Sequence, residues 1–105
     1  MKKLDLASTF VILDRTHAAT AVDVTPTIWQ ELGERFEGFE GRVLVSCFDF
    51  DKDWEGWERH PAGDEIAEPG SYVVIPKNTW HTAKTSVPTR MIFVTPGKGT
   101  GHRPL

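Results

Sequence analysis

The sequence has little of several features that mark particular classes of protein. It contains a single cysteine, Cys47, so no internal disulfide can form, and apolar neighbours on both sides are typical of a buried thiol in a reducing compartment. No apolar run reaches the length of a membrane-spanning helix, about 18 residues. Asp5 and Asp14 interrupt the apolar segment that a secretory signal peptide needs. We therefore expect a soluble, cytoplasmic protein that does not bind a membrane.

An excess of positive charge is also missing. The chain has 12 basic and 15 acidic residues and a net charge of −3. This charge balance argues against a basic surface that binds phosphates, so we expect no nucleic-acid partner. Its 105 residues, 39% apolar and 26% charged, are typical of one globular domain spanning 1–105. Four tryptophans and six phenylalanines supply the large side chains that such a small core requires.

Short runs rich in β-branched and aromatic residues make up most of the chain, and turn-forming residues separate them. These runs predict strands at Thr9–Leu13, Arg42–Asp51, Ser71–Pro76 and Arg90–Thr95. Many short strands with regular turns favour an all-β antiparallel sandwich or barrel over a parallel sheet.

One helix is expected near the N-terminus. Thr25 can cap it and Pro26 suits its first position. The spacing of Ile28, Trp29, Leu32 and Phe36 forms one apolar stripe. The chain is thus divided into N-terminal strands and a helix (1–41), a barrel core (42–95) and a loop or tail rich in glycine and proline (96–105).

Side chains able to bind a metal gather in two segments. Glu58 and His60 are two residues apart, on one face of a strand, and a Pro-Ala-Gly-Asp turn can fold Glu65 back beside them. In the second segment, a turn after a hydrophobic strand delivers His81 to the start of the next strand. Several potential ligands therefore converge.

These segments resemble the two sequence motifs of the cupins. The second motif is nearly intact: Gly70 is followed after five residues by Pro76, and His81 stands in the ligand position, although Asn78 and Thr85 replace the usual Gly and Asn. The first motif is half intact. The pair His60 and Glu65 matches, whereas Glu58 replaces the first histidine and Lys52 the first glycine. The amino-acid sequences of both segments are similar to those of small bacterial cupins.

The resemblance implies a jelly-roll barrel with a metal site made of Glu58, His60, Glu65 and His81. Two imidazole nitrogens and two carboxylate oxygens suit a divalent transition metal such as Fe²⁺, Mn²⁺, Ni²⁺ or Zn²⁺. The alternative is a vestigial pocket without metal, in which Glu58 pairs with Arg59 or Arg90. Trp57 and Trp80 are candidates to line the pocket, with packing in the core as the competing interpretation. His17 and His102 are expected in irregular, solvated segments.

The segment between the two motifs is shorter than in the family. After Glu65 and Ile66, only Ala67, Glu68 and Pro69 precede Gly70 of the second motif, where cupins run a further hairpin. We expect a direct hairpin from Ile66 to Tyr72 and a shortened, partly open barrel. The lost neighbours would leave an edge or an apolar face uncovered, which predicts a homodimer or a strand-exchanged oligomer.

Two classes of function follow from this resemblance. The first is a metal-dependent enzyme, similar to dioxygenases or isomerases, acting on a small organic molecule. The second is a module that binds or senses a small molecule without catalysis, or a folding unit that keeps the ligands but has no activity. No catalytic residue outside the metal ligands is identified, and the sequence leaves the choice between enzyme and binding protein open.

Overall fold

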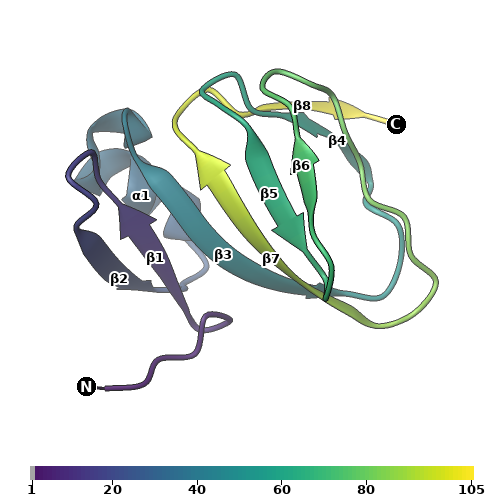
Figure 1. Ribbon diagram of the computed structural model, residues 1–105, viewed down its shortest axis with the longest axis horizontal. Helices are drawn as coiled ribbons and strands as arrows, with labels where there is room; N and C mark the ends of the chain where they lie inside the picture. Colours follow the sequence, from purple (N-terminus) through teal and green to yellow (C-terminus); the bar gives the residue numbers. More distant parts are fainter. Residues whose placement is uncertain (1) are drawn as a thin grey trace.

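A six-stranded antiparallel sheet dominates the computed structural model, which describes residues 2–105 (Figure 1). Its strand order is β2-β1-β3-β7-β5-β6, and β4 and β8 form a separate two-stranded ribbon. The elements in chain order are β1 (Thr9–Leu13), β2 (Ala19–Asp23), α1 (Ile28–Arg35), the 3₁₀ turn η1 (Glu37–Phe39), β3 (Val43–Phe50), β4 (Gly56–Arg59), β5 (Glu65–Glu68), β6 (Val73–Ile75), β7 (Thr89–Pro96) and β8 (Gly101–Pro104).

The predicted class, mostly β and antiparallel with one helix near the N-terminus, is confirmed. The large sheet is not closed into a barrel in residues 2–105, because β2 and β6 each have a neighbour on one side only. No helix within these residues combines the length and the apolar character needed to cross a membrane.

The direct hairpin between the two motifs is confirmed. β5 and β6 pair with Glu65 opposite Ile75 and Ala67 opposite Val73. Gly70 in the connecting turn has a φ of 110°, in the region that favours glycine, and its N–H donates to the carboxylate of Glu68. The short connection thus makes the strand that carries Glu65 an antiparallel neighbour of the strand that leads towards His81.

The hydrophobic core lies between the inner face of the sheet and the helix. Phe10, Ile12 and Leu44 point inwards from β1 and β3 and pack against Ile28 and Leu32 of α1. The helix was expected to be capped by Thr25, but its N-cap is Thr27, and the hydroxyl of Thr25 instead donates to the carboxylate of Glu31. Trp29 also departs from the predicted stripe, since it is 58% exposed.

A network of hydrogen bonds at the surface holds the turn between β1 and β2. One carboxylate oxygen of Asp14 accepts the backbone N–H groups of Thr16 and Ala18 and the hydroxyl of Thr16, at 2.8, 3.0 and 2.7 Å. The side-chain hydrogen bond from Thr16, followed by the two backbone bonds, lowers the pKa of Asp14 below its ordinary value. This turn places His17 in the exposed connection, as predicted.

The C-terminal segment differs from the expected loop or tail, because Gly101–Pro104 forms β8 and pairs with β4. The pairing sets Glu58 opposite His102 and Arg59 opposite Gly101. Composition misled here because backbone pairing with β4 needs no β-branched side chains. Figure 1 shows this ribbon beside β5 and β6, on the side of the molecule away from β2.

Gly97 makes the turn that brings the chain from β7 to β8. Its φ is 59°, and a Cβ added to it would collide with the side chain of Ala62. Its N–H donates to the carbonyl of Arg42 at 2.7 Å. A residue without a side chain is therefore required where this turn crosses the loop after His60.

Candidate metal centre

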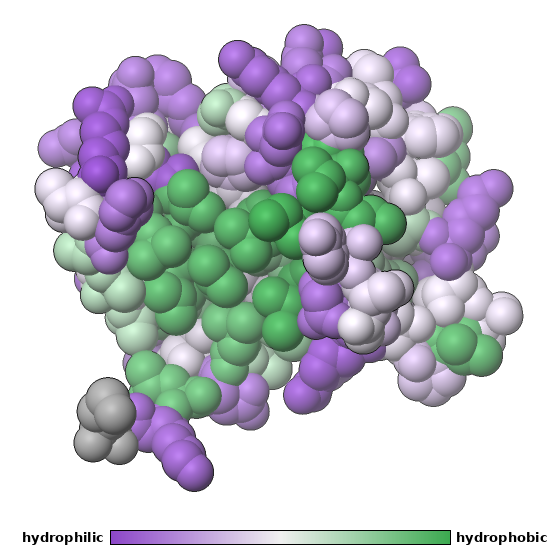
Figure 2. Space-filling view, viewed as in Figure 1, coloured by the Kyte–Doolittle hydropathy of each residue, from purple (hydrophilic) through white to green (hydrophobic). Residues whose placement is uncertain are grey.

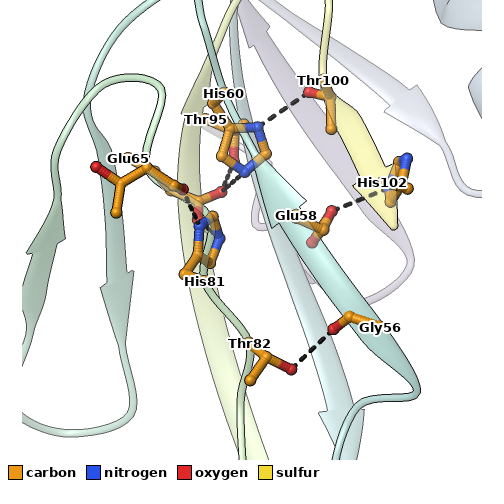
Figure 3. Close-up of polar contacts among 10 residues, drawn as sticks. Gly56, Glu58, His60, Glu65, His81, Thr82, Thr95, Thr100 and His102 are labelled. Atoms are coloured by element: carbon orange, nitrogen blue, oxygen red, sulfur yellow. Dashed lines mark hydrogen bonds and ion pairs between the residues drawn. The ribbon is translucent and has the colours of Figure 1, made fainter. Parts of the chain in front are cut away.

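The four predicted ligands come together between the ribbon and the inner face of the large sheet (Figure 3). Glu58 lies in β4, and His60 comes directly after that strand, two residues from Glu58, so both side chains share one face. His81 joins them through a bridge in which the backbones of Glu58 and His81 exchange two hydrogen bonds of 2.9 Å. Glu65 enters from β5 on the opposite side.

Glu65 contacts both imidazoles. Its Oε2 lies 3.1 Å from Nε2 of His60, and its Oε1 lies 3.1 Å from Nε2 of His81. Glu65 and His60 are nearly sealed from solvent, with 3% and 5% of their surface exposed. Ligand atoms of Glu58, His60 and His81 lie within 4.8 Å of one another. The side chains of Glu58, His60, Glu65 and His81 therefore lie close to one another in the fold.

Three further groups orient these side chains. The hydroxyl of Thr95 on β7 donates to Oε2 of Glu65 at 2.6 Å. Nδ1 of His60 is 3.0 Å from the hydroxyl of Thr100, and Nδ1 of His81 donates to the carbonyl oxygen of Thr79 at 3.0 Å. Each Nδ1 is thus held by the protein and each Nε2 is directed at the carboxylate of Glu65. Hydrogen bonds from neighbouring groups orient metal-binding histidines in this way.

The contact between His81 and Glu65 is chemically unsatisfied as it stands. A carbonyl oxygen can only accept, so Nδ1 of His81 must carry a proton, and in a neutral imidazole Nε2 then presents a lone pair. That lone pair faces Oε1 of Glu65, which is also an acceptor. Neither atom has a hydrogen-bond partner, although both are buried. Two acceptors 3.1 Å apart need a cation between them, either a proton or a metal ion.

The charge state of Glu65 strengthens this requirement. Burial alone would raise the pKa of Glu65, but the 3.1 Å contact of its Oε2 with Nε2 of His60, the hydrogen bond from Thr95 and attraction to imidazoles that carry a proton outweigh burial and keep the pKa below its ordinary value. The buried carboxyl is therefore held as an anion.

Glu58 lies at the open side of the cluster. Its Oε2 is 3.2 Å from Nε2 of His102, whose side chain is 70% exposed. The alternative pairings of Glu58 with Arg59 or Arg90 are not observed: Arg90 binds Asp49, and the guanidinium of Arg59 stacks on an indole ring instead. His102 is exposed, as expected, but it belongs to a strand and lines the pocket.

A pocket of about 780 Å³ opens beside the cluster, and Glu58, His60 and Glu65 form part of its wall. Most of the remaining wall is apolar and comes from the inner face of the sheet and from α1. The aromatic members are Trp29, Phe39, Phe48, Phe50, Trp54 and Phe93.

Trp57 and Trp80 do not line this pocket. Trp57 directly precedes Glu58 and Trp80 directly precedes His81, and the side chains of Glu58 and His81 point into the site. Because side chains alternate along an extended chain, the two tryptophans point to the other face of the ribbon. There the guanidinium of Arg103 lies 4.5 Å from the ring of Trp80 and 5.7 Å from that of Trp57. The guanidinium of Arg59 lies 4.9 Å from Trp80. The two tryptophans thus belong to a cation–π stack outside the pocket.

Trp54 takes the place expected for them. It lies in the loop before β4, and its ring centroid is 5.8 Å from that of Phe93 and 6.3 Å from that of His81. The sequence did not predict that Trp54 lines the pocket, because its neighbours in the loop are polar. Thr95 had a usable signal, because it alternates with the inward-facing Phe93 on β7.

Comparison of the chain with protein-family models, with curated proteins and with solved structures finds no match.

Proposed function

We propose that this protein binds one divalent transition metal through His60, Glu65 and His81, with Glu58 as a fourth ligand. The observation that carries the proposal is the pair of buried, unpartnered acceptors, Nε2 of His81 and Oε1 of Glu65, 3.1 Å apart. Nε2 of His60 also lacks a hydrogen-bond partner. Groups of this kind cost about 1–3 kcal/mol each when left unsatisfied, and a bound cation satisfies them together.

The donor set limits the kind of ion. Two imidazoles with one or two carboxylates suit Fe²⁺, Mn²⁺, Ni²⁺ or Zn²⁺ rather than the all-oxygen coordination of Ca²⁺ or Mg²⁺. When bound, such an ion supplies Lewis acidity or, for iron, activation of oxygen. The protein's own part is to hold both Nε2 atoms and the carboxylate of Glu65 in place through Thr95, Thr100 and the carbonyl of Thr79.

The pocket beside the cluster indicates what else is bound. Its aromatic wall, including Trp54 and Phe93, suits the apolar body of a small organic molecule, and the metal-binding end suits one oxygen donor of that molecule. We therefore propose a small oxygenated compound as the ligand. Binding without turnover remains the second candidate function, since the pocket holds no titratable side chain that is both buried and free of the cluster.

Metal analysis of the purified protein tests the proposal. The wild type, loaded with excess Fe²⁺, Mn²⁺, Ni²⁺ or Zn²⁺ and then desalted, should retain about one equivalent of at least one of these ions. His60→Ala and His81→Ala should lose it. His17→Ala is the matched control, because His17 is exposed in the turn between β1 and β2.

Circular dichroism of each variant establishes that it remains folded. Retention of no ion by the folded wild type, or full retention by His60→Ala and His81→Ala, contradicts the proposal. A metal-loaded protein can then be titrated with small carboxylic acids and phenols. Quenching of tryptophan fluorescence that is reduced in Trp54→Leu would place the organic ligand in the pocket.

A further inference from the structure

One face of the large sheet is apolar from edge to edge. Inward-facing residues such as Phe10 alternate with outward-facing residues such as Val11, so the outward side chains of all six strands form one surface. The strand register aligns a central row across the whole sheet: Ala21, Val11, Val45, Val94, Ile66 and Val74, in the order β2-β1-β3-β7-β5-β6. We call this surface the outer sheet face.

Neighbouring rows extend the outer sheet face along the strands. Leu13 pairs with Val43 on one side of the central row, and Ile92 lies on the other side, paired with Cys47, which is itself buried. Figure 2 shows the result as a continuous hydrophobic surface bordered by hydrophilic residues. The helix packs on the opposite side of the sheet, and within residues 2–105 no helix or strand covers this face (Figure 1).

The charged residues on this side, Asp23, Asp49, Glu68 and Arg90, lie at the ends of the strands, at the border of the face. Arg90 donates two hydrogen bonds to the carboxylate of Asp49, at 2.7 and 3.0 Å. Glu68 accepts a backbone N–H in its own turn. The rows between these borders carry no charged side chain, so the middle of the outer sheet face fits a flat, uncharged, apolar surface. A second copy of the chain carries such a surface.

The area of the face suits a dimer of modest stability. Six strands about 4.8 Å apart, with outward rows over about 20 Å of strand, give roughly 500 Å². Two copies would bury about 1,000 Å², which is near the lower limit for a specific interface. A monomer seldom exposes more than a few hundred Å² of contiguous apolar surface. Two such sheets pack face to face about 10 Å apart, with the strand directions within about 30°.

We propose that two copies of this chain associate through their outer sheet faces. The proposal concerns a surface on the other side of the sheet from the metal site and does not depend on that site. Of the edge and the face expected from the sequence, the proposal concerns the face. The edge strands β2 and β6 have five and three residues and offer few backbone groups for pairing.

Substitutions on the hairpin β5–β6 test the proposal by sedimentation velocity from micromolar to millimolar protein. Ile66→Lys and Val74→Lys place a charge on the outer sheet face at positions already 39% and 52% exposed, so the monomer can solvate it. Val73→Lys is the matched control: Val73 is 57% exposed and lies on the same edge strand, but it pairs with inward-facing Ala67.

The wild type should pass from monomer to dimer as its concentration rises. Ile66→Lys and Val74→Lys should each raise the dimer dissociation constant at least about tenfold, because like charges meet across the interface. Val73→Lys should leave it within about twofold. Circular dichroism at low concentration checks that all three variants fold.

Two results would overturn the proposal. A wild type that stays monomeric at every concentration shows that copies of this chain do not cover the face. A dimer weakened equally by Val73→Lys and Val74→Lys shows pairing along the edge of β6 instead of association through the face.

Discussion

Replacing Glu65 by glutamine should have opposite effects on the metal-free and the metal-bound protein. In the wild type, Oε2 of Glu65 accepts a hydrogen bond from Thr95, whereas Oε1 faces the lone pair of His81. A glutamine in the same position can keep its oxygen on Thr95 and direct its NH₂ group at Nε2 of His81. The substitution therefore converts an acceptor–acceptor contact into a hydrogen bond without changing the shape of the side chain.

The magnitude follows from the burial of these atoms. An unsatisfied buried polar group costs about 1–3 kcal/mol, so metal-free Glu65→Gln should be more stable than the metal-free wild type by about that amount when the imidazoles are neutral. In a domain of this size each kcal/mol shifts the melting temperature by about 4–8 °C. Metal at about 100 times its dissociation constant should stabilise the wild type by about 2.7 kcal/mol and the variant by much less.

Thermal unfolding followed by circular dichroism at about pH 8, with chelator and with added Zn²⁺, measures both effects. Glu68→Gln is the control for loss of a carboxylate, because Glu68 is on the same strand but outside the site. A Glu65→Gln variant that melts below the wild type in chelator, and that Zn²⁺ stabilises as much as it stabilises the wild type, would show that the contact between Glu65 and His81 is not an unsatisfied one.

Three further substitutions test other parts of the structure. Thr95→Val should weaken metal binding about 10–100-fold by removing the donor to Glu65, whereas Thr95→Ser should retain most of the affinity in competition titrations; equal affinities for all three proteins would contradict this role. The native fold lowers the pKa of Asp14, so the ionised side chain of Asp14 should stabilise the fold. This stabilisation should be complete above the pKa of the unfolded state, near 4, and should disappear as the pH falls through the pKa of the folded state. Urea midpoints of the wild type and Asp14→Asn should converge at acid pH, and a constant difference would argue against it. Gly97→Ala should lower the free energy of unfolding by clearly more than Gly38→Ala does. Gly38 has a similar φ but open space around it, so its replacement should cost only about 1 kcal/mol. Equal losses for the two variants in urea unfolding would rule out the collision with Ala62.

Much of the fold is encoded locally. Val43–Phe50 and Thr9–Leu13 form strands almost where their β-branched and aromatic residues predicted them. β2 and β8 were not predicted, since alanine, threonine, glycine and proline dominate them and their pairing with β1 and β4 supplies what their own side chains do not. Strand pairing is a property of the partner as much as of the segment.

In the candidate site, too, some residues could be predicted from the local sequence and others could not. Glu58, His60, Glu65 and His81 were found because motif spacing brings them together, and spacing is visible in sequence. Thr95, Thr100 and His102 were not found, because their contacts depend on strand register across distant segments. The error at Trp57 was avoidable: a residue next to Glu58 on a strand must face the other way.

The most direct test of the metal site is an NMR measurement on the imidazole nitrogens of all four histidines. Long-range ¹H–¹⁵N correlation spectra, recorded on metal-free protein and after one equivalent of Zn²⁺, report the state of each Nδ1 and Nε2. We predict that Nε2 of His60 and of His81 take up metal-bound chemical shifts while both Nδ1 atoms stay protonated, and that His17 does not change. Unchanged Nε2 shifts at His60 and His81, or metal-bound shifts only at His17 or His102, would contradict the account.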